Sequence, residues 1–241
     1  MQTNEAILEN LALIDKAFNE IYENIRPDTS PILDGVVDLA NYLESPIKIM
    51  WILKEPWDED DLTGGGWSLT KHILAIDKRR NDLVLHKTGS HTWHPIVYVS
   101  YSVYNNFQLW DDMDHIRNNH SMIDSLKTIA YINVSKLPGG KTVQDYNLLQ
   151  ANYNRTKHLL FKQIEILNPE ILIMGNTLNY FINDLRLDRN QGKSFGSTIK
   201  YYTHNSQLII DAYHPAQRTT KRADYVNDLI NLIKEWKTGN L

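Results

Sequence analysis

The chain carries a largely apolar run, Ile47 to Leu53, in which Lys48 is the one charged residue and which stops at Lys54, Glu55 and Pro56. A short apolar run without polar alternation is typical of a strand that is covered on both faces, and such strands belong to parallel sheets. In parallel sheets, functional groups lie just beyond the carboxyl ends of the strands. The pattern therefore predicts a buried strand with a functional loop directly after it.

Apolar residues recur at helical spacing in further segments, which proline, glycine and asparagine separate. The predicted helices are 5–25, 32–43, 97–110, 121–129, 146–167, a short one within 176–184, and 223–236. Apolar runs predict further strands at 129–136, 170–175, 198–204 and 207–213, the last two joined at Asn205-Ser206. An aromatic residue stands at every third position from Tyr98 to Trp110, and we interpret these aromatics as the buried face of a helix.

Helices and strands alternate along the second half of the chain, without a linker, repeat or low-complexity segment between them. This order predicts an α/β fold, a three-layer α/β/α sandwich with a central, mainly parallel sheet of four to five strands. A length of 241 residues and an apolar content of 42% suffice for one domain over 1–241, in which 1–45 form an N-terminal helical part.

The composition excludes several kinds of site. The chain has no cysteine, and therefore no disulfide, thiolate metal site or cysteine nucleophile. His91 and His94 have the spacing of metal ligands, but no acidic partner is evident, so we expect neither a metal nor a cofactor. Gly64, Gly65 and Gly66 lack the spacing and the Lys-Ser/Thr pair of a phosphate-binding loop.

The location of the protein follows from its N-terminus and its charge. The segment MQTNEAILEN lacks the basic and apolar regions of a signal peptide, and no segment reaches the length of a membrane span. We expect a soluble monomer in the cytoplasm or at the nucleoid, with no membrane partner. A formal net charge of −4 argues against a wholly basic nucleic-acid-binding surface, but it permits a local basic face.

Polar residues follow several of the predicted strands. Glu55 comes after the first strand, Asn133 lies at the end of the strand over 129–136, and His214 follows the last strand. Because parallel strands end at the same edge of a sheet, we expect an acid, an amide and a histidine to converge there. Such a set suits the positioning and hydrolysis of a polar ring.

On these residues the chain resembles the uracil-DNA glycosylase superfamily, and the likeness extends from Ile47 to Lys234. Members carry an acid- or amide-bearing motif with proline after the first strand, an asparagine after a middle strand and a His-Pro pair after the last. The resemblance implies that Glu55, before Pro56, orients the attacking water and that His214 supports the departing base anion. It also implies a DNA partner, base flipping and a role in base-excision repair.

The base-binding residues follow from the same resemblance. Asn133 matches the asparagine that hydrogen-bonds the flipped base, and Trp67 matches the aromatic residue that stacks on it. Trp57 matches the residue that crowds the 5-position of the base, and Pro56 belongs to the same motif. The segments PWDEDD and GGGW are similar to the iron-sulfur branch of the superfamily, whose cluster this cysteine-free chain cannot hold.

Two departures from the family pattern stand near these motifs. Leu53 or Lys54 occupies the place where the first motif normally opens with glycine, so the backbone donors to the base are expected to be repositioned. After His-Pro, where an apolar wedge often fills the vacated position in the duplex, this chain has AQRTTKR. Basic residues near the motifs are expected to contact DNA phosphates. These cations are Lys136, Lys141, Arg218, Lys221 and Arg222.

The chemistry of the reaction suits these residues without appeal to the family. Cleavage of an N-glycosidic bond builds positive charge on the sugar and negative charge on the base, so a carboxylate at Glu55 and a donor at His214 stabilise the transition state. Two alternatives remain open at this point. One is a nucleic-acid or nucleotide binding module of the same fold without catalysis, and the other is a hydrolase of free nucleosides, which needs no basic surface.

Overall fold

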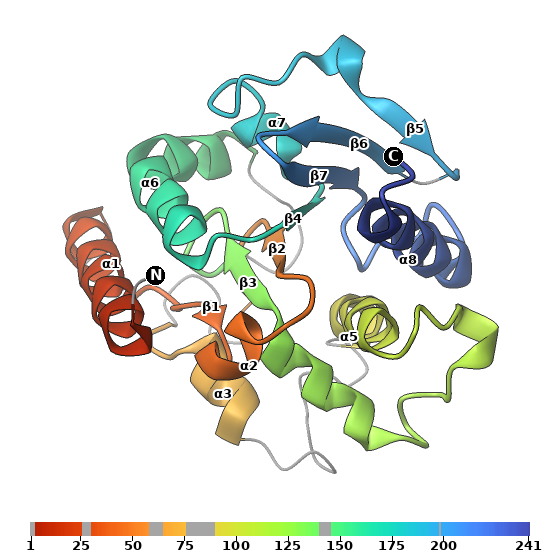
Figure 1. The fold of residues 1–241 in the computed structure, drawn as a ribbon. Helices are drawn as coiled ribbons and strands as arrows, with labels where there is room; N and C mark the ends of the chain where they lie inside the picture. The colour runs from red at the N-terminus through yellow and green to blue at the C-terminus, as the bar shows by residue number, and fades with distance from the viewer. Residues whose placement is uncertain (1–2, 26–29, 58–64, 76–89, 140–145, 198) are drawn as a thin grey trace.

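A computed structural model describes residues 3–25, 30–57, 65–75, 90–139, 146–197 and 199–241. At its centre lies a seven-stranded mixed sheet with the strand order β1-β3-β2-β4-β7-β6-β5 (Figure 1). The neighbouring strands β3, β2, β4 and β7 are parallel, whereas β1, β6 and β5 run antiparallel to their neighbours. The strands are β1 (Gly35–Val36), β2 (Ile49–Leu53), β3 (Ala130–Asn133), β4 (Ile171–Gly175), β5 (Lys193–Phe195), β6 (Ile199–His204) and β7 (Gln207–Ala212).

The register of the parallel strands aligns their carboxyl ends at one edge of the sheet. Leu53 at the end of β2 pairs with Asn133 at the end of β3. On the other side of β2, strand β4 ends at Gly175, which pairs with Ala212 at the end of β7. The residues after these strands therefore start from neighbouring positions, as the sequence predicts.

Helices cover both faces of the sheet (Figure 1). One face packs against α5 (Ser90–Tyr104), α8 (Arg222–Thr238) and the 3-10 helix His120–Thr128. The opposite face packs against α1 (Asn4–Ile25), α6 (Tyr146–Leu167) and α7 (Leu178–Phe181). The remaining helical segments are α2 (Leu39–Leu43), α3 (Leu69–Ala75) and the 3-10 turns Trp110–Asp112 and Arg189–Gln191. None of the described helices is both long and apolar enough to cross a lipid bilayer.

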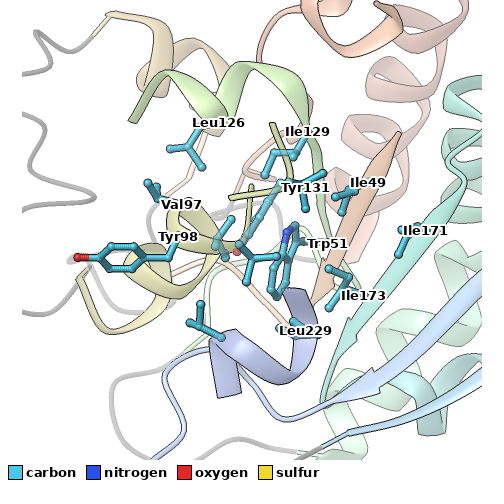
Figure 2. Close-up of a cluster of buried hydrophobic side chains, with 14 of the residues drawn as sticks. Ile49, Trp51, Val97, Tyr98, Leu126, Ile129, Tyr131, Ile171, Ile173 and Leu229 are labelled. Atoms are coloured by element: carbon cyan, nitrogen blue, oxygen red, sulfur yellow. The ribbon is translucent and has the colours of Figure 1, made fainter. Parts of the chain in front are cut away.

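The position of strand β2 between two hydrophobic cores explains why the segment before Lys54 is apolar. All five of its residues are buried, as predicted. Trp51 lies in the core on the α5 and α8 side, together with Tyr131, Val97 and Leu229 (Figure 2). Ile52 faces the opposite core, against α1 and α6. A strand with a hydrophobic core on each face requires apolar residues at every position, and this requirement removes the alternation.

The predicted helix over 32–43 is wrong in its first half. The segment forms the two-residue strand β1 and only then the short helix α2. Gly35 adopts a φ of 132°, which is outside the helical region, and Asp38 caps α2 by accepting the N–H of Asn41 at 3.1 Å. The apolar residues of this segment therefore mark a strand and a turn instead of one continuous helix.

The predicted aromatic helix over 97–110 is confirmed only in part: Tyr98 is buried, whereas the other four aromatic residues are partly buried, and the helix has different bounds. Helix α5 begins at Ser90 and ends at Tyr104, and most of its residues are buried. Asn106 and Phe107 then adopt positive φ values of 57° and 58°, which end the helix. Trp110 lies beyond this turn, in a separate 3-10 turn.

The sheet has more strands than the predicted four to five. Strands β1 and β5 have only two and three residues, and β5 is largely exposed, so neither leaves an apolar run in the sequence. The predicted link between β6 and β7 is confirmed as a two-residue turn, in which Asn205 and Ser206 have φ values of 48° and 61°. Two positive φ values match the turn type that joins twisted antiparallel strands. The structure is therefore an α/β fold with a partly parallel, seven-stranded sheet.

Candidate active site

Glu55 is held between strand β2 and the turn that follows β3. The carbonyl of Lys54 accepts the N–H of Ser135 at 2.9 Å, and the buried Pro56 accepts the N–H of Gly139 through its carbonyl at 2.9 Å. A Cβ atom at Gly139 would lie 2.5 Å from Cγ of Glu55. A side chain at Gly139 would require Glu55 to move, so glycine lets the carboxylate side chain pack against this backbone.

His214 is fixed by the compact loop that follows β7. Its Nδ1 accepts the N–H of Ala216 at 3.2 Å, and its carbonyl accepts the N–H of Gln217 at 2.8 Å. Burial and, as a smaller contribution, the positive charge of Lys54 together lower the pKa of His214 from 6.5 to about 4. The imidazole is therefore neutral at pH 7. Because Nδ1 is an acceptor, the ring proton lies on Nε2, which is a hydrogen-bond donor.

Gly175, at the end of β4, lies beside both the end of β2 and the loop that follows β7. A Cβ atom at Gly175 would lie 2.2 Å from Cδ2 of Leu53 and 3.4 Å from Cδ of Pro215. The absence of a side chain lets Leu53 and Pro215 approach across the end of β4. The next residue, Asn176, turns away with a φ of 62° and donates its N–H to the carbonyl of Ala212 at 2.8 Å.

Three further residues join this edge of the sheet. The ammonium of Lys54 lies 5.2 Å from the ring centroid of Tyr146, at the start of α6. Burial lowers the pKa of Lys54, and the charge of Glu55 acts in the opposite direction. Burial raises the pKa of Tyr180, on α7, to about 12, and the negative charge of Glu55 adds to this shift. We call Lys54, Glu55, Tyr146, Tyr180 and His214 the edge cluster.

The edge cluster was only partly visible in the sequence. Glu55 and His214 were predicted from their places after β2 and β7, and Lys54 stands directly before Glu55. Tyr146 and Tyr180 were missed, because they lie on helices and no sequence signal tells which helical residue faces the end of a strand. The cluster combines a carboxylate, a neutral imidazole donor, an amine and two phenols.

Asn133, predicted to read the edge of a base, lies in the interior. Its side chain is fully buried, and its amide nitrogen donates to Oδ2 of Asp34 at 3.3 Å. Its amide oxygen accepts the hydroxyl of Tyr131 at 3.4 Å. Its backbone N–H also donates to Asp34, at 2.8 Å. Both ends of the amide therefore have partners within the protein.

Lys136, predicted to contact DNA phosphate, is also in the interior, and this prediction is wrong for the structure. Its side chain has an exposed fraction of 0%, and its ammonium lies 2.5 Å from Oδ1 of Asp34. The ammonium also lies 4.9 Å from the ring centroid of Phe18 on α1. A sequence cannot show whether a lysine after a strand faces solvent or a buried acid. Here the acid is 102 residues away along the chain.

The residues around Lys136 form a second set of charged and polar groups, which we call the interior cluster. It consists of Asp15, Asp34, Asn133 and Lys136. Burial raises the pKa of Asp34 and lowers the pKa of Lys136, while each partner's charge opposes the shift of the other. Burial also raises the pKa of Asp15, on α1, to about 6, and the charge of Asp34 adds to this effect.

The two predicted tryptophans lie in different places. Trp57 is 50% exposed and forms a backbone bridge with Gly139, beside the edge cluster. Trp67 packs against the core, with its ring 5.5 Å from that of His72. The N–H of Leu33 donates to the carbonyl of Trp67 at 3.1 Å, and the N–H of Ile32 to that of Lys136 at 2.8 Å. Segments 30–34 and 134–136 therefore lie between the backbone of Trp67 and that of Lys54.

The remaining predicted cations are unevenly placed. Arg218 and Lys221 are exposed, in the loop after His214 and at the start of α8. Arg222 is partly buried, and its Nη2 lies 3.3 Å from Nδ1 of His91 on α5. Lys141 lies outside the described residues. Two of the five predicted phosphate contacts are therefore exposed next to the edge cluster.

The two histidines with metal-ligand spacing have other neighbours. Arg222 faces His91, and the rings of Tyr98 and His115 lie 6.2 Å and 6.1 Å from that of His94. Over the described ranges, no group of three or more histidine and acidic side chains is arranged to hold a metal ion.

Two surface depressions lie away from the edge cluster. One, of about 250 Å³, is lined by residues of the 186–193 segment and of β6. The other, of about 440 Å³, lies between α5 and the 3-10 helix His120–Thr128. Neither depression is lined by Glu55 or His214. We therefore assign the candidate site from the reactive groups that lie together at the edge of the sheet and not from pocket volume.

Comparison of the chain with known protein-family models and with curated proteins gave no match.

Proposed function

We propose that the protein is a DNA glycosylase that hydrolyses the N-glycosidic bond of uracil or of a related damaged base, with a three-layer α/β/α architecture similar to that of uracil-DNA glycosylases. One observation carries the proposal. Glu55 and the neutral, Nε2-protonated His214 follow the ends of β2 and β7, and their neighbours Leu53 and Pro215 both lie beside Gly175 at the end of β4.

The proposed reaction uses the two groups on opposite sides of the bond that breaks. Charge separates in the transition state, because the sugar becomes positive and the base negative. The carboxylate of Glu55 orients a water molecule and stabilises the positive sugar. The Nε2–H of His214 donates to the base oxygen on which negative charge develops, and a neutral donor is already present at pH 7 because burial keeps the imidazole unprotonated.

The surroundings of the edge cluster suit a nucleic-acid substrate. Trp57 and Tyr146 are exposed by 50% and 62%, and Tyr213, directly before His214, by 41%. Exposed aromatic rings can stack on bases that have left the helix, and Arg218 and Lys221 lie where they can contact phosphates. These features support DNA as the partner, with the target base turned out of the stack.

A binding module without catalysis is the second candidate, and two observations favour it. The amide of Asn133 is occupied by Asp34 and Tyr131, so it does not present a base-reading edge. Leu53 or Lys54 stands where the resembled family has glycine. The third candidate, a hydrolase of free nucleosides, gains support from the burial of Lys136, since this leaves fewer cations for phosphate than the sequence predicts.

One assay separates the three candidates. Single- and double-stranded oligonucleotides that carry uracil or other altered bases, together with the matching free nucleosides, would be incubated with the protein, and the released base would be quantified by chromatography. We expect release from at least one oligonucleotide and none from free nucleosides. Binding without release supports the module, and release from nucleosides alone supports the third candidate.

A further inference from the structure

The described residues include two lysines whose pKa is lowered, and the two differ in their exposure to solvent. Lys136 is sealed in the interior and paired with Asp34 at 2.5 Å. Lys54 is only partly buried, at the carboxyl edge of the sheet, and its pKa is lowered mainly by that burial. An amine with a lowered pKa is a better nucleophile at neutral pH, because a larger fraction of it is unprotonated.

The surroundings of Lys54 bring its amine to the proposed site of base release. Its ammonium lies 5.2 Å from the ring centroid of Tyr146, and its charge acts on both His214 and Glu55. If Glu55 lies beside the sugar and His214 beside the base, an amine whose charge acts on both is near the sugar carbon that has lost the base. That carbon, C1′, is a carbonyl carbon when the abasic sugar is in its ring-opened form.

We propose that Lys54 forms an imine with C1′ of an abasic deoxyribose and that the protein thereby cleaves the DNA strand on the 3′ side of the abasic site. This activity goes beyond base release, although it rests on the proposed function for the placement of the sugar in the edge cluster. Lysine amines form such imines readily with carbonyl compounds.

The reaction balances without an oxidant or a reductant. The unprotonated Nζ of Lys54 attacks C1′, the N–C bond forms, and the carbonyl oxygen takes up a proton. Loss of water gives a protonated imine. The carboxylate of Glu55 then accepts a proton from C2′, a C2′=C3′ double bond forms, and the C3′–O bond breaks, so that the 3′ fragment leaves with a 5′-phosphate. Water hydrolyses the imine and restores the amine.

Borohydride trapping tests this inference directly. The full chain would be mixed with an oligonucleotide that carries a preformed abasic site, in the presence of sodium borohydride, which reduces an imine to a stable amine. We expect a one-to-one covalent complex that requires both the abasic site and borohydride. Mass spectrometry of the digested complex should locate the modification on Lys54. Without borohydride, we expect strand cleavage to a 3′ unsaturated aldehyde.

Variants of the two lysines that flank β2 provide the control. Lys54→Arg keeps the charge and Lys54→Met keeps much of the length, and both should lose the covalent complex and the cleavage. Lys48→Gln, directly before the opposite end of β2, should retain both. Glu55→Gln should still form the complex but should cleave the strand more slowly, because proton removal from C2′ loses its acceptor.

Three outcomes would overturn the inference. They are the absence of a complex with the wild type at any concentration of abasic DNA, the same yield of complex from Lys54→Arg as from the wild type, and a modification that maps to another lysine. The abasic site is preformed, so the experiment does not depend on base release. Trapping without base release would contradict the proposed glycosylase and keep the imine activity, and base release without trapping would do the reverse.

Discussion

The lysines of the edge cluster and of the interior cluster follow two neighbouring strands, β2 and β3, yet the charged groups of the two clusters differ in burial and in pairing. In the interior cluster, Lys136 and Asp34 are fully buried, and their ionic contact is supplemented by the backbone N–H and amide of Asn133. In the edge cluster, Lys54, Glu55 and His214 are partly exposed, and their charges oppose or support one another without complete burial.

Under the proposed function, this difference separates a structural role from a chemical one. A buried ion pair with additional hydrogen bonds holds α1 and the segment before β1 against the end of β3. Partly buried groups with lowered pKa values at the ends of parallel strands are typical of sites that act on a ligand. The type of residue does not make this distinction, because each cluster contains one lysine and at least one acid. The distinction depends on burial and on partners.

The interior cluster should respond most strongly to loss of its cation. Lys136→Met leaves Asp34 as a buried, unpaired acid, and we expect the free energy of unfolding to fall by about 3–5 kcal/mol. Urea denaturation followed by circular dichroism measures this change. The matched control is Lys157→Met, which breaks an exposed pair with Asp184 at 2.7 Å and should cost at most about 1 kcal/mol. Equal effects at the two sites would contradict the structural role.

In the edge cluster, we expect the pKa of His214 to be lowered by partial burial and by the charge of Lys54. Its pKa in the folded state, about 4, lies below the unfolded value of 6.5, so the unfolded chain binds more protons between these values. The contribution of His214 to stability is therefore complete above pH 6.5 and is lost as the pH falls towards 4. Nuclear magnetic resonance of the imidazole should give a pKa well below 6.5, and Lys54→Met should raise it.

The pH dependence of the free energy of unfolding gives a second test of the His214 pKa. His214→Gln should become more stable relative to the wild type as the pH falls from 6.5 to 4, because the variant has no imidazole to protonate on unfolding. A His214 pKa well above 7 would remove the neutral donor from the proposed mechanism.

The smallest expected effect concerns DNA affinity. With Arg218 and Lys221 as the exposed cations, about two phosphate contacts should give a log-log salt slope near −1.4 on single strands and near −1.8 on duplex. Arg218→Ala should make the slope shallower by about one unit. Affinity titrations from low to moderate salt test this, with Lys193→Ala, on the distant strand β5, as a control. A slope that does not change on loss of Arg218 would exclude this loop as a phosphate contact.

The sequence predicted the parts of the fold that depend on periodicity. Strand β2 and helix α6 have the predicted places, because an unbroken apolar run and a long helical repeat each allow one interpretation. Glu55 and His214 could also be predicted, since parallel strands end at one edge. The short strands β1 and β5 could not, because two or three residues carry no periodic signal.

The sequence could not predict whether a polar side chain at the end of a strand faces solvent or the interior. Asn133 and Lys136 were expected to face a ligand, but both face Asp34, which lies 99 and 102 residues earlier. Nothing local to Asn133 indicates such a partner. Tyr180 was missed for a related reason, since only the packing of α7 against the sheet brings it close enough for the charge of Glu55 to act on it. Chain contacts of this range decide which polar residues remain available for chemistry.

The central claim is that the edge cluster cleaves an N-glycosidic bond through Glu55 and His214. Single-turnover release of base from the preferred oligonucleotide, measured for the wild type, Glu55→Gln and His214→Ala, tests it most directly, with Lys48→Gln as a control. We predict that each of the two edge variants lowers the rate by about 10²–10⁴-fold while the dissociation constant for DNA changes far less. Rates of the two edge variants within a few-fold of the wild type would contradict the claim.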